Sequence, residues 1–197
     1  MKRFFDILMS LFGLIILSPF IIITALAIKM EDKGPVFYRS QRVGLSGKLF
    51  KMYKFRTMVE KAELSGPSST ATNDTRITKT GKFLRRFKID EIPQLINVLV
   101  GKMSIVGPRP EIKRFTDMFS EDEKAILNVK PGITDWASIW NSNEGELLKG
   151  CEDPDEYYIK NIRPEKLRLQ LIYAGNHNFF IDLQIIFLTL RKIVFKH

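Results

Sequence analysis

The sequence predicts a mainly helical α+β protein that is attached to a membrane. Residues 7–28 contain no charged side chain, and an apolar run of this length is about what one helix needs to cross a bilayer. Within residues 78–100, apolar side chains recur every three or four positions, which favours helix. Two short runs rich in aromatic and basic residues, 36–38 and 50–55, flank a Gly-Leu-Ser-Gly turn signal. This pattern predicts a β-hairpin.

The apolar run is interrupted near its centre by Ser18-Pro19. Proline has no N–H and frees the carbonyl of Ile15, so the Ser18 hydroxyl or a bent backbone must satisfy that carbonyl in lipid. Positive charge favours the cytoplasmic face of a membrane, and basic residues flank the run on both sides: Lys2, Arg3, Lys29 and Lys33. The segment is therefore compatible with entry and return to the same face, whereas hydropathy alone favours an ordinary single-pass helix.

The composition restricts the chemistry that the chain can perform. A net charge of +9 and a pI near 9.6 indicate an anionic partner, which could be nucleic acid, an anionic membrane surface or a phosphate-rich substrate. The single cysteine, Cys151, excludes an intrachain disulfide and a cysteine-based zinc site. With only two histidines, catalysis must depend on carboxylates, Lys, Arg, hydroxyl groups and a hard cation with oxygen ligands.

Turn and capping signals divide the rest of the chain into short segments. We expect a polar, mobile loop at residues 64–75 and a second loop, stiffened by prolines, at residues 104–110. We expect helices at residues 120–128, capped by Ser120 with Glu123, and at 164–173. Residues 179–196 are mostly apolar and end with basic side chains. They predict an amphipathic helix in the membrane interface, although a buried core helix fits equally well.

The residues that can carry chemistry concentrate between positions 85 and 111. Asp90-Glu91 precedes an apolar periodic run with Pro93 in its first turn, which predicts Asp90 as a helix N-cap beside an anion site. Arg85 lies upstream, and Arg109 lies between two prolines that stiffen its backbone. Guanidinium groups suit phosphate recognition. The alternative is a structural cap with ordinary surface ion pairs.

Four sequence blocks together resemble one known family. They read KMYKFRTM at 51–58, GKFLRRFKIDEIPQLINVLV at 81–100, GKMSIVGPRPE at 101–111 and KPGIT at 130–134. In this order they resemble the bacterial sugar transferase family, the monotopic phosphoglycosyl transferases, over nearly the whole chain. The small size suggests the minimal catalytic unit, without the extra N-terminal membrane helices of larger relatives.

The resemblance implies an activity. Such enzymes transfer a sugar 1-phosphate from a UDP-sugar to a polyprenol phosphate, typically undecaprenyl phosphate, and release UMP in the first membrane step of surface glycan assembly. By motif, Asp90 is the catalytic nucleophile that forms a covalent phosphosugar intermediate, and Glu91 assists it. Glu91 would assist as a metal ligand or as a base, and the resemblance implies Mg²⁺ at Asp90 and Glu91 without deciding which of the two holds it. The implied substrate-binding residues are Lys54, Arg56, Arg85, Arg109, Glu111 and Thr134.

The resemblance also implies a topology and a set of partners. Residues 1–30 would form a re-entrant helix-break-helix bent at Ser18-Pro19, and residues 31–197 a catalytic domain on the cytoplasmic face of the bacterial inner membrane. The partners would be the UDP-sugar, the polyprenol phosphate and membrane lipid, with no nucleic acid; a homo-oligomer is left open.

The chain departs from the family pattern at two places. Many relatives read KPGITGWAQ where this chain has Asp135 and Ser138, and an insert lies between Trp140 and Glu165. Two other functions stay open. One is a polyprenyl-linked phosphohydrolase that uses the same two carboxylates. The other is a non-enzymatic, basic, membrane-anchored nucleic-acid or scaffold protein, although the basic residues lie beside an acidic pair rather than in an aromatic stripe.

Overall fold

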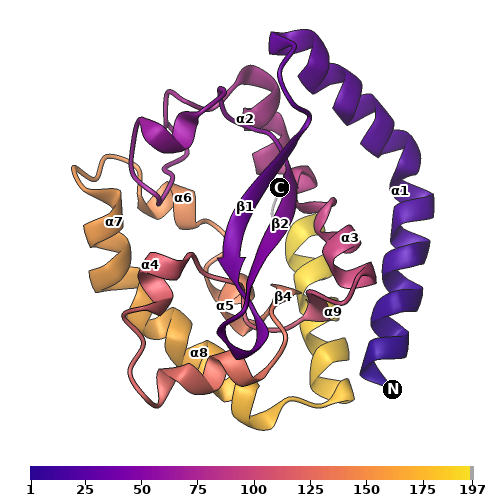
Figure 1. Cartoon of the computed structure of the whole chain (residues 1–197), viewed down its shortest axis with the longest axis vertical. Helices are drawn as coiled ribbons and strands as arrows, with labels where there is room; N and C mark the ends of the chain where they lie inside the picture. Colours follow the sequence, from indigo (N-terminus) through magenta and orange to yellow (C-terminus); the bar gives the residue numbers. More distant parts are fainter. Residues whose placement is uncertain (196–197) are drawn as a thin grey trace.

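The computed structural model describes residues 1–195, and its longest element is the N-terminal helix α1, Lys2–Asp32. By length and composition this apolar helix could cross a membrane. Pro19 lies inside it, and the Ser18 hydroxyl donates to the carbonyl oxygen of Ile15 at 2.7 Å, so the carbonyl freed by proline is satisfied as predicted. The expected break in the helix is not seen. With this carbonyl satisfied, α1 continues past Pro19 as one curved helix along the edge of the molecule (Figure 1).

Both ends of α1 are bound to the rest of the protein. Near its start, the Lys2 ammonium donates to the Asp182 carboxylate at 2.5 Å, and Asp6 accepts from the backbone N–H of Ile105 at 3.0 Å. At its end, Glu31 accepts from the backbone N–H of Lys79 at 2.8 Å. Between these anchors the outer side of α1 presents large exposed apolar side chains, among them Phe12, Ile16, Phe20 and Ile23.

The predicted hairpin is confirmed, with a longer first strand than expected. Strands β1, Phe37–Val43, and β2, Leu49–Phe55, pair antiparallel from Phe37↔Phe55 to Val43↔Leu49. The turn between them uses left-handed backbone at Ser46 (φ 54°) and Gly47 (φ 75°). One face of the hairpin buries Phe50 and Met52 against Val98 and Met103, which fixes the hairpin next to helix α3.

The helical pattern of residues 78–100 is split into three pieces. Helix α2, Lys79–Arg86, is capped by Thr78, whose hydroxyl accepts from the backbone N–H of Gly81 at 3.0 Å. The 3₁₀ helix η3, Ile89–Glu91, and helix α3, Gln94–Leu99, follow. Lys88 adopts a left-handed conformation (φ 58°) that turns the chain between α2 and η3. The prediction of Asp90 as N-cap of the following helix is wrong, because Asp90 lies inside η3 and Pro93 occupies the N-cap position.

A second, parallel sheet was not predicted. Strands β3, Ser104–Val106, and β4, Gly132–Thr134, pair through Ser104↔Gly132 and Val106↔Thr134. We expected a loop at residues 104–110, and three-residue strands are too short to show a periodic pattern. Glycine is required where the strands end: a Cβ atom on Gly107 would lie 2.3 Å from the carbonyl oxygen of Lys130.

The remaining described elements are short, except for two helices near the C-terminus. Helix α8, Arg163–Asn176, confirms the predicted helix, and the Ser120–Glu123 capping pair is present, with reciprocal bonds of 2.9 and 3.2 Å. The short elements are the 3₁₀ helices η1 Leu45–Gly47, η2 Ala62–Leu64 and η4 Glu123–Asn128, the helices α4 Lys113–Thr116, α5 Trp136–Trp140, α6 Glu144–Leu147 and α7 Pro154–Tyr157, and the π-helix η5 Tyr158–Ile162.

The C-terminal helix α9, Phe179–Val194, has features of both structures predicted for it, the buried core helix and the interfacial helix. Its inner face buries Ile185 against Val106 and Tyr173, as a core helix would. Its outer face leaves Phe187 and Leu190 exposed, as an interfacial helix would. The last residues of the predicted segment, from 196 on, lie outside the described part of the chain.

Candidate active site

Asp90 and Glu91 lie where two other parts of the chain meet the segment between α2 and α3. The two carboxylates lie in η3, between α2 and α3. Lys54 reaches them from the end of β2, and Arg109 reaches them from the loop that follows β3. We call Lys54, Asp90, Glu91 and Arg109 the dyad cluster. Residues separated by more than fifty positions in the sequence are thus brought together by the hairpin and the parallel sheet.

Glu91 binds both cations of the dyad cluster. Arg109 Nη1 donates to Glu91 Oε2 at 3.1 Å, and Arg109 Nη2 pairs with Oε1 in a two-pronged contact. Lys54 Nζ donates to Glu91 Oε1 at 3.0 Å. Burial disfavours the charge of Glu91, but Arg109 and Lys54 outweigh it and lower the pKa of Glu91 well below its usual range. The two cations therefore favour the ionised form of Glu91.

Asp90 has the opposite environment. Asp90 is 6 % exposed, and its Oδ1 atom is buried without a hydrogen-bond partner among the described residues. Lys54 Nζ lies 3.7 Å from Asp90 Oδ2, which is longer than a hydrogen bond. Burial and the nearby Glu91 charge raise the pKa of Asp90 against the opposing effects of Lys54 and Arg85. Neighbouring carboxylates with pKa values pushed apart are typical of groups with different catalytic roles.

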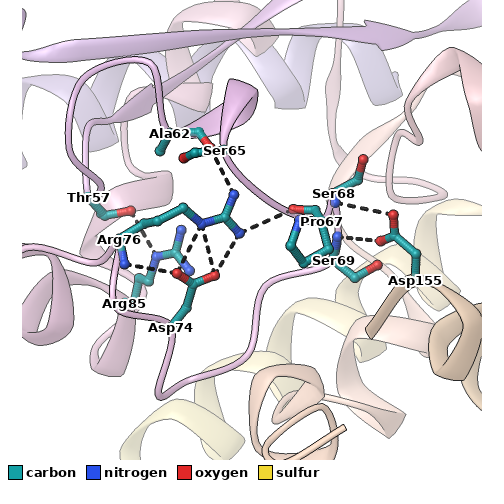
Figure 2. A network of polar contacts seen from close by, with 10 residues as sticks. All are labelled: Thr57, Ala62, Ser65, Pro67, Ser68, Ser69, Asp74, Arg76, Arg85 and Asp155. Carbon is teal, nitrogen blue, oxygen red and sulfur yellow. Dashed lines mark hydrogen bonds and ion pairs between the residues drawn. The ribbon is translucent and has the colours of Figure 1, made fainter. Parts of the chain in front are cut away.

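Arg85 adjoins the dyad cluster from α2. Its Nε donates to the Thr57 hydroxyl at 2.8 Å, a contact that Figure 2 shows beside Asp74. Burial lowers the pKa of Arg85, and the charges of Asp90 and Asp74 oppose that effect. Arg85 thus lies between the dyad cluster and the loop before α2.

The loop before α2 is irregular, as predicted, but it is held by side-chain contacts (Figure 2). Arg76 binds the Asp74 carboxylate and also donates to the carbonyl oxygens of Ala62 at 2.8 Å and Pro67 at 3.2 Å. Asp155 of α7 accepts from the backbone N–H of Ser69 at 2.7 Å. The contact with Asp155 joins the loop to the segment between Trp140 and Glu165, which we interpreted from the sequence as an insert.

Three predicted substrate-binding residues have other partners. Arg56 pairs with Asp32 at the end of α1, although its Nε and Nη1 atoms are buried without partners among the described residues. Thr134 is bonded to the Thr189 hydroxyl at 2.8 Å. The third, Glu111, accepts from the Tyr158 hydroxyl at 2.6 Å and pairs with Lys166. The structure therefore brings Lys54 and Arg109 into contact with the dyad, but not these three.

Two polar residues near the cluster were missed by the sequence analysis. Arg42 lies on the same face of the hairpin as Lys54, and its charge interacts with Arg109 and Glu111. Gln94, on the first turn of α3, is completely buried, and both its amide atoms lack partners among the described residues. Alternation along β1 could have identified Arg42 if the strand had been predicted at its full length.

The dyad offers few oxygen ligands for Mg²⁺. The buried Oδ1 atom of Asp90 has no hydrogen-bond partner among the described residues, whereas both oxygens of Glu91 are bound by cations. Across residues 1–195, no group of three or more His, Cys, Asp or Glu side chains is placed to hold a metal ion. Mg²⁺ commonly binds through one or two carboxylates together with substrate phosphates, so Asp90 fits this mode and Glu91 fits it only after releasing a cation.

Comparison with known proteins assigns the family. The model of the bacterial sugar transferase family matches residues 1–196. This chain belongs to that family. It is 37% identical over 194 residues to the sugar transferase EpsL of Bacillus subtilis (strain 168), covering 98% of this chain and 87% of EpsL.

Two longer relatives have more specific names. The UDP-glucose:undecaprenyl-phosphate glucose-1-phosphate transferase of Escherichia coli (strain K12) is 36% identical over 98% of this chain. The UDP-N-acetylgalactosamine-undecaprenyl-phosphate N-acetylgalactosaminephosphotransferase of Aeromonas hydrophila is 35% identical over 98%. The chain spans only 40% and 43% of these two proteins. The predicted family and the prediction of a transferase enzyme are confirmed.

Proposed function

We propose that this protein transfers a sugar 1-phosphate from a UDP-sugar to undecaprenyl phosphate. The observation that carries the proposal is the buried Asp90 carboxylate, which has an oxygen without a partner in the described part of the chain. It lies near Lys54 and beside Glu91, which binds Arg109. A carboxylate with a free oxygen can attack phosphorus, and the cations can bind the phosphate oxygens of a diphosphate. The names of the E. coli and A. hydrophila relatives support these substrates.

The proposed reaction has two steps at Asp90. Its carboxylate oxygen attacks the phosphorus next to the sugar, the bond from that phosphorus to the bridging oxygen breaks, and UMP leaves with the electron pair. An oxygen of undecaprenyl phosphate then attacks the aspartyl phosphate, which forms the lipid diphosphosugar and regenerates Asp90. Because each step is a displacement at phosphorus, the overall transfer is divided into two easier reactions.

The other residues of the dyad cluster prepare the substrate for this attack. Arg109 and Lys54 exchange part of their contact with Glu91 for contacts with the diphosphate, whose charge they neutralise. Glu91 keeps the two cations in place before the substrate arrives. Arg85 contributes a further positive charge from α2. Magnesium, when bound at Asp90 with the phosphates, would supply additional neutralisation of the diphosphate.

We also propose that both ends of α1 lie on the cytoplasmic face of the inner membrane, with the unbroken, curved helix dipping into the cytoplasmic leaflet and not crossing the bilayer. A helix of 31 residues is about 46 Å long, which is enough to cross a bilayer if it stands upright. However, Lys2 binds Asp182 of α9 while Glu31 binds the start of α2, so both ends contact the same domain. A spanning helix would have to give up the contacts at one end.

The activity is tested by measuring UMP release from a panel of UDP-sugars by the protein in nanodiscs. We expect turnover with one or a few sugars when undecaprenyl phosphate is present. Without the acceptor, we expect a single stoichiometric release of UMP and a phosphosugar bound to Asp90. Continuous UMP release without acceptor would instead show a phosphohydrolase. No release together with salt-dependent binding of nucleic acid would favour the non-enzymatic alternative.

The topology is tested by cysteine labelling in intact cells. In a Cys151→Ser background, a single cysteine placed directly before Lys2 should react with a membrane-impermeant maleimide only after the cells are permeabilised. A single cysteine at the exposed position of Lys149 in the domain is the matched control. Labelling of the N-terminal cysteine in intact cells, with the control protected, would show a spanning helix.

A further inference from the structure

The backbone of Arg109 is held as firmly as its guanidinium. The N–H of Arg109 donates to Asp135 Oδ2 at 3.1 Å, and the carbonyl oxygen of Arg109 accepts from Gln170 Nε2 at 3.3 Å. The same Gln170 Nε2 donates to Asp135 Oδ2 at 3.1 Å. The Asp135 and Gln170 residues are 0% and 1% exposed. These two buried side chains form a closed set of contacts behind Arg109, which we call the clamp.

The fold gives the clamp two rigid supports. Asp135 follows strand β4 and caps helix α5, where its Oδ1 accepts from the backbone N–H of Ser138 at 2.7 Å. Gln170 lies on α8, the longest helix between β4 and α9. Arg109 itself lies between Pro108 and Pro110, so its neighbours have fixed φ angles. The clamp therefore connects the loop after β3 to β4, α5 and α8.

An ordinary helix cap does not account for this arrangement. Capping α5 requires only one oxygen of Asp135, but the second oxygen is directed to Arg109 and Gln170. Gln170 is buried at the cost of leaving its Oε1 atom without a partner among the described residues. An apolar side chain at this position would avoid that cost. Gln170 instead provides the Nε2 group, which donates hydrogen bonds to the Asp135 carboxylate and to the Arg109 carbonyl oxygen.

We propose that Asp135 and Gln170 are positioning residues that set the direction in which Arg109 presents its guanidinium to the substrate diphosphate. This inference deepens the proposed function and rests on it. With its N–H and carbonyl both fixed, Arg109 loses little additional freedom when it exchanges Glu91 for phosphate oxygens. A two-pronged guanidinium contact depends on its angle, so a small rotation of the backbone would weaken it.

The first test is a double-mutant cycle between Gln170 and Arg109. Gln170→Met keeps the approximate volume of the side chain and removes both hydrogen bonds that Gln170 Nε2 donates in the clamp. We expect it to lower kcat/KM for UMP release about tenfold in the wild-type background. In an Arg109→Ala background the same change should cost less than about twofold, because the residue that it positions is gone. Gln184→Met, the same change at an exposed position of α9, is the matched control.

A structural role alone gives a different pattern. If Gln170→Met lowers kcat/KM by the same factor with and without Arg109, the clamp does not act through Arg109 and the proposal is overturned. Asp135→Asn keeps the shape of the side chain but removes one acceptor oxygen, and it should show the same dependence on Arg109. It serves as the second variant if Gln170→Met is poorly folded.

The second test does not require activity. Because both neighbours of Arg109 are proline, its amide is the only exchangeable backbone hydrogen between Gly107 and Glu111. We expect hydrogen exchange in this segment to become about tenfold faster in Gln170→Met and Asp135→Asn, but not in Gln184→Met. Unchanged exchange would show that the clamp is absent. If exchange changes but no UDP-sugar releases UMP, the proposed function fails while the clamp stands.

Discussion

Glu91 and Glu111 are two largely buried glutamates that bind cationic side chains, but they belong to different kinds of cluster. Glu91 pairs with Lys54 and Arg109, and Glu111 pairs with Lys166 and accepts from the Tyr158 hydroxyl. Both carboxylates have lowered pKa values: burial opposes their charges, and nearby cations outweigh it. Charge and burial therefore do not distinguish them.

The difference lies in what adjoins each glutamate. Next to Glu91 is Asp90, a second carboxylate with a raised pKa whose buried Oδ1 atom has no hydrogen-bond partner within residues 1–195. One oxygen of the dyad cluster is therefore not committed to a structural contact there. Lys166 and Tyr158 bind each other as well as Glu111, so that cluster is closed. Burial also raises the pKa of Tyr158, which keeps it a neutral donor. We therefore propose a role in the reaction for the first cluster and a role in stability for the second.

The largest expected effect is the loss of turnover in Asp90→Asn. The amide keeps the shape of the side chain but is a poor nucleophile, so UMP release should fall by at least about a thousandfold. Burial raises the pKa of Asp90 and makes a neutral side chain tolerable there, so the thermal midpoint should change little. The check is UMP release together with thermal unfolding in nanodiscs. Near-normal turnover would exclude Asp90 as the nucleophile.

Glu111→Gln should do the opposite, with a large effect on stability and a small one on turnover. Removing one partner leaves Lys166 buried without its counter-charge, which costs about 3 kcal/mol in the free energy of unfolding. The double variant Glu111→Gln with Lys166→Met should recover part of this loss, because no unpaired charge remains. Denaturant unfolding measures both. A fall in kcat comparable to that of Asp90→Asn would place Glu111 in the active site.

Arg109→Lys tests whether the two-pronged contact matters beyond its charge. Lysine keeps the positive charge but loses the planar fork, so we expect kcat/KM to fall by about 10- to 100-fold, with kcat as well as KM affected. Arg168→Lys, an exposed arginine paired with Glu165, is the matched control and should retain normal rates. Near-wild-type rates for Arg109→Lys would reduce Arg109 to an ordinary ion-pair partner.

The smallest expected effect is a pH dependence of the Glu111 cluster. The pKa of Glu111 is lower in the folded protein than in the unfolded chain, so its stabilisation is complete above the ordinary glutamate value, about 4.3, and is lost as the pH falls through the lowered value. The stability gap between wild type and Glu111→Gln should therefore be widest near neutral pH and narrow under acid conditions. A gap that stays constant with pH would show that the Glu111 charge is not involved.

The sequence by itself determined the local features of this protein. The apolar run, the Ser18 hydroxyl that satisfies Ile15, the hairpin, the Ser120–Glu123 capping pair and the helix at α8 all follow from neighbouring residues. The four blocks that resemble the bacterial sugar transferases also identified the family. Such features depend on spacing within a few residues, which a sequence displays directly.

Only the tertiary structure decided which charged residues meet. Spacing along the chain could not show that Lys54 and Arg109 reach Glu91, that Glu111 turns to Lys166, or that Asp135 and Gln170 hold Arg109. The left-handed turn at Lys88, which moves Asp90 out of the cap position, and the short parallel sheet that places the Arg109 loop were also not predicted. The physical reason is that buried ion pairs and short strands form between distant segments, and their partners are set by how those segments pack.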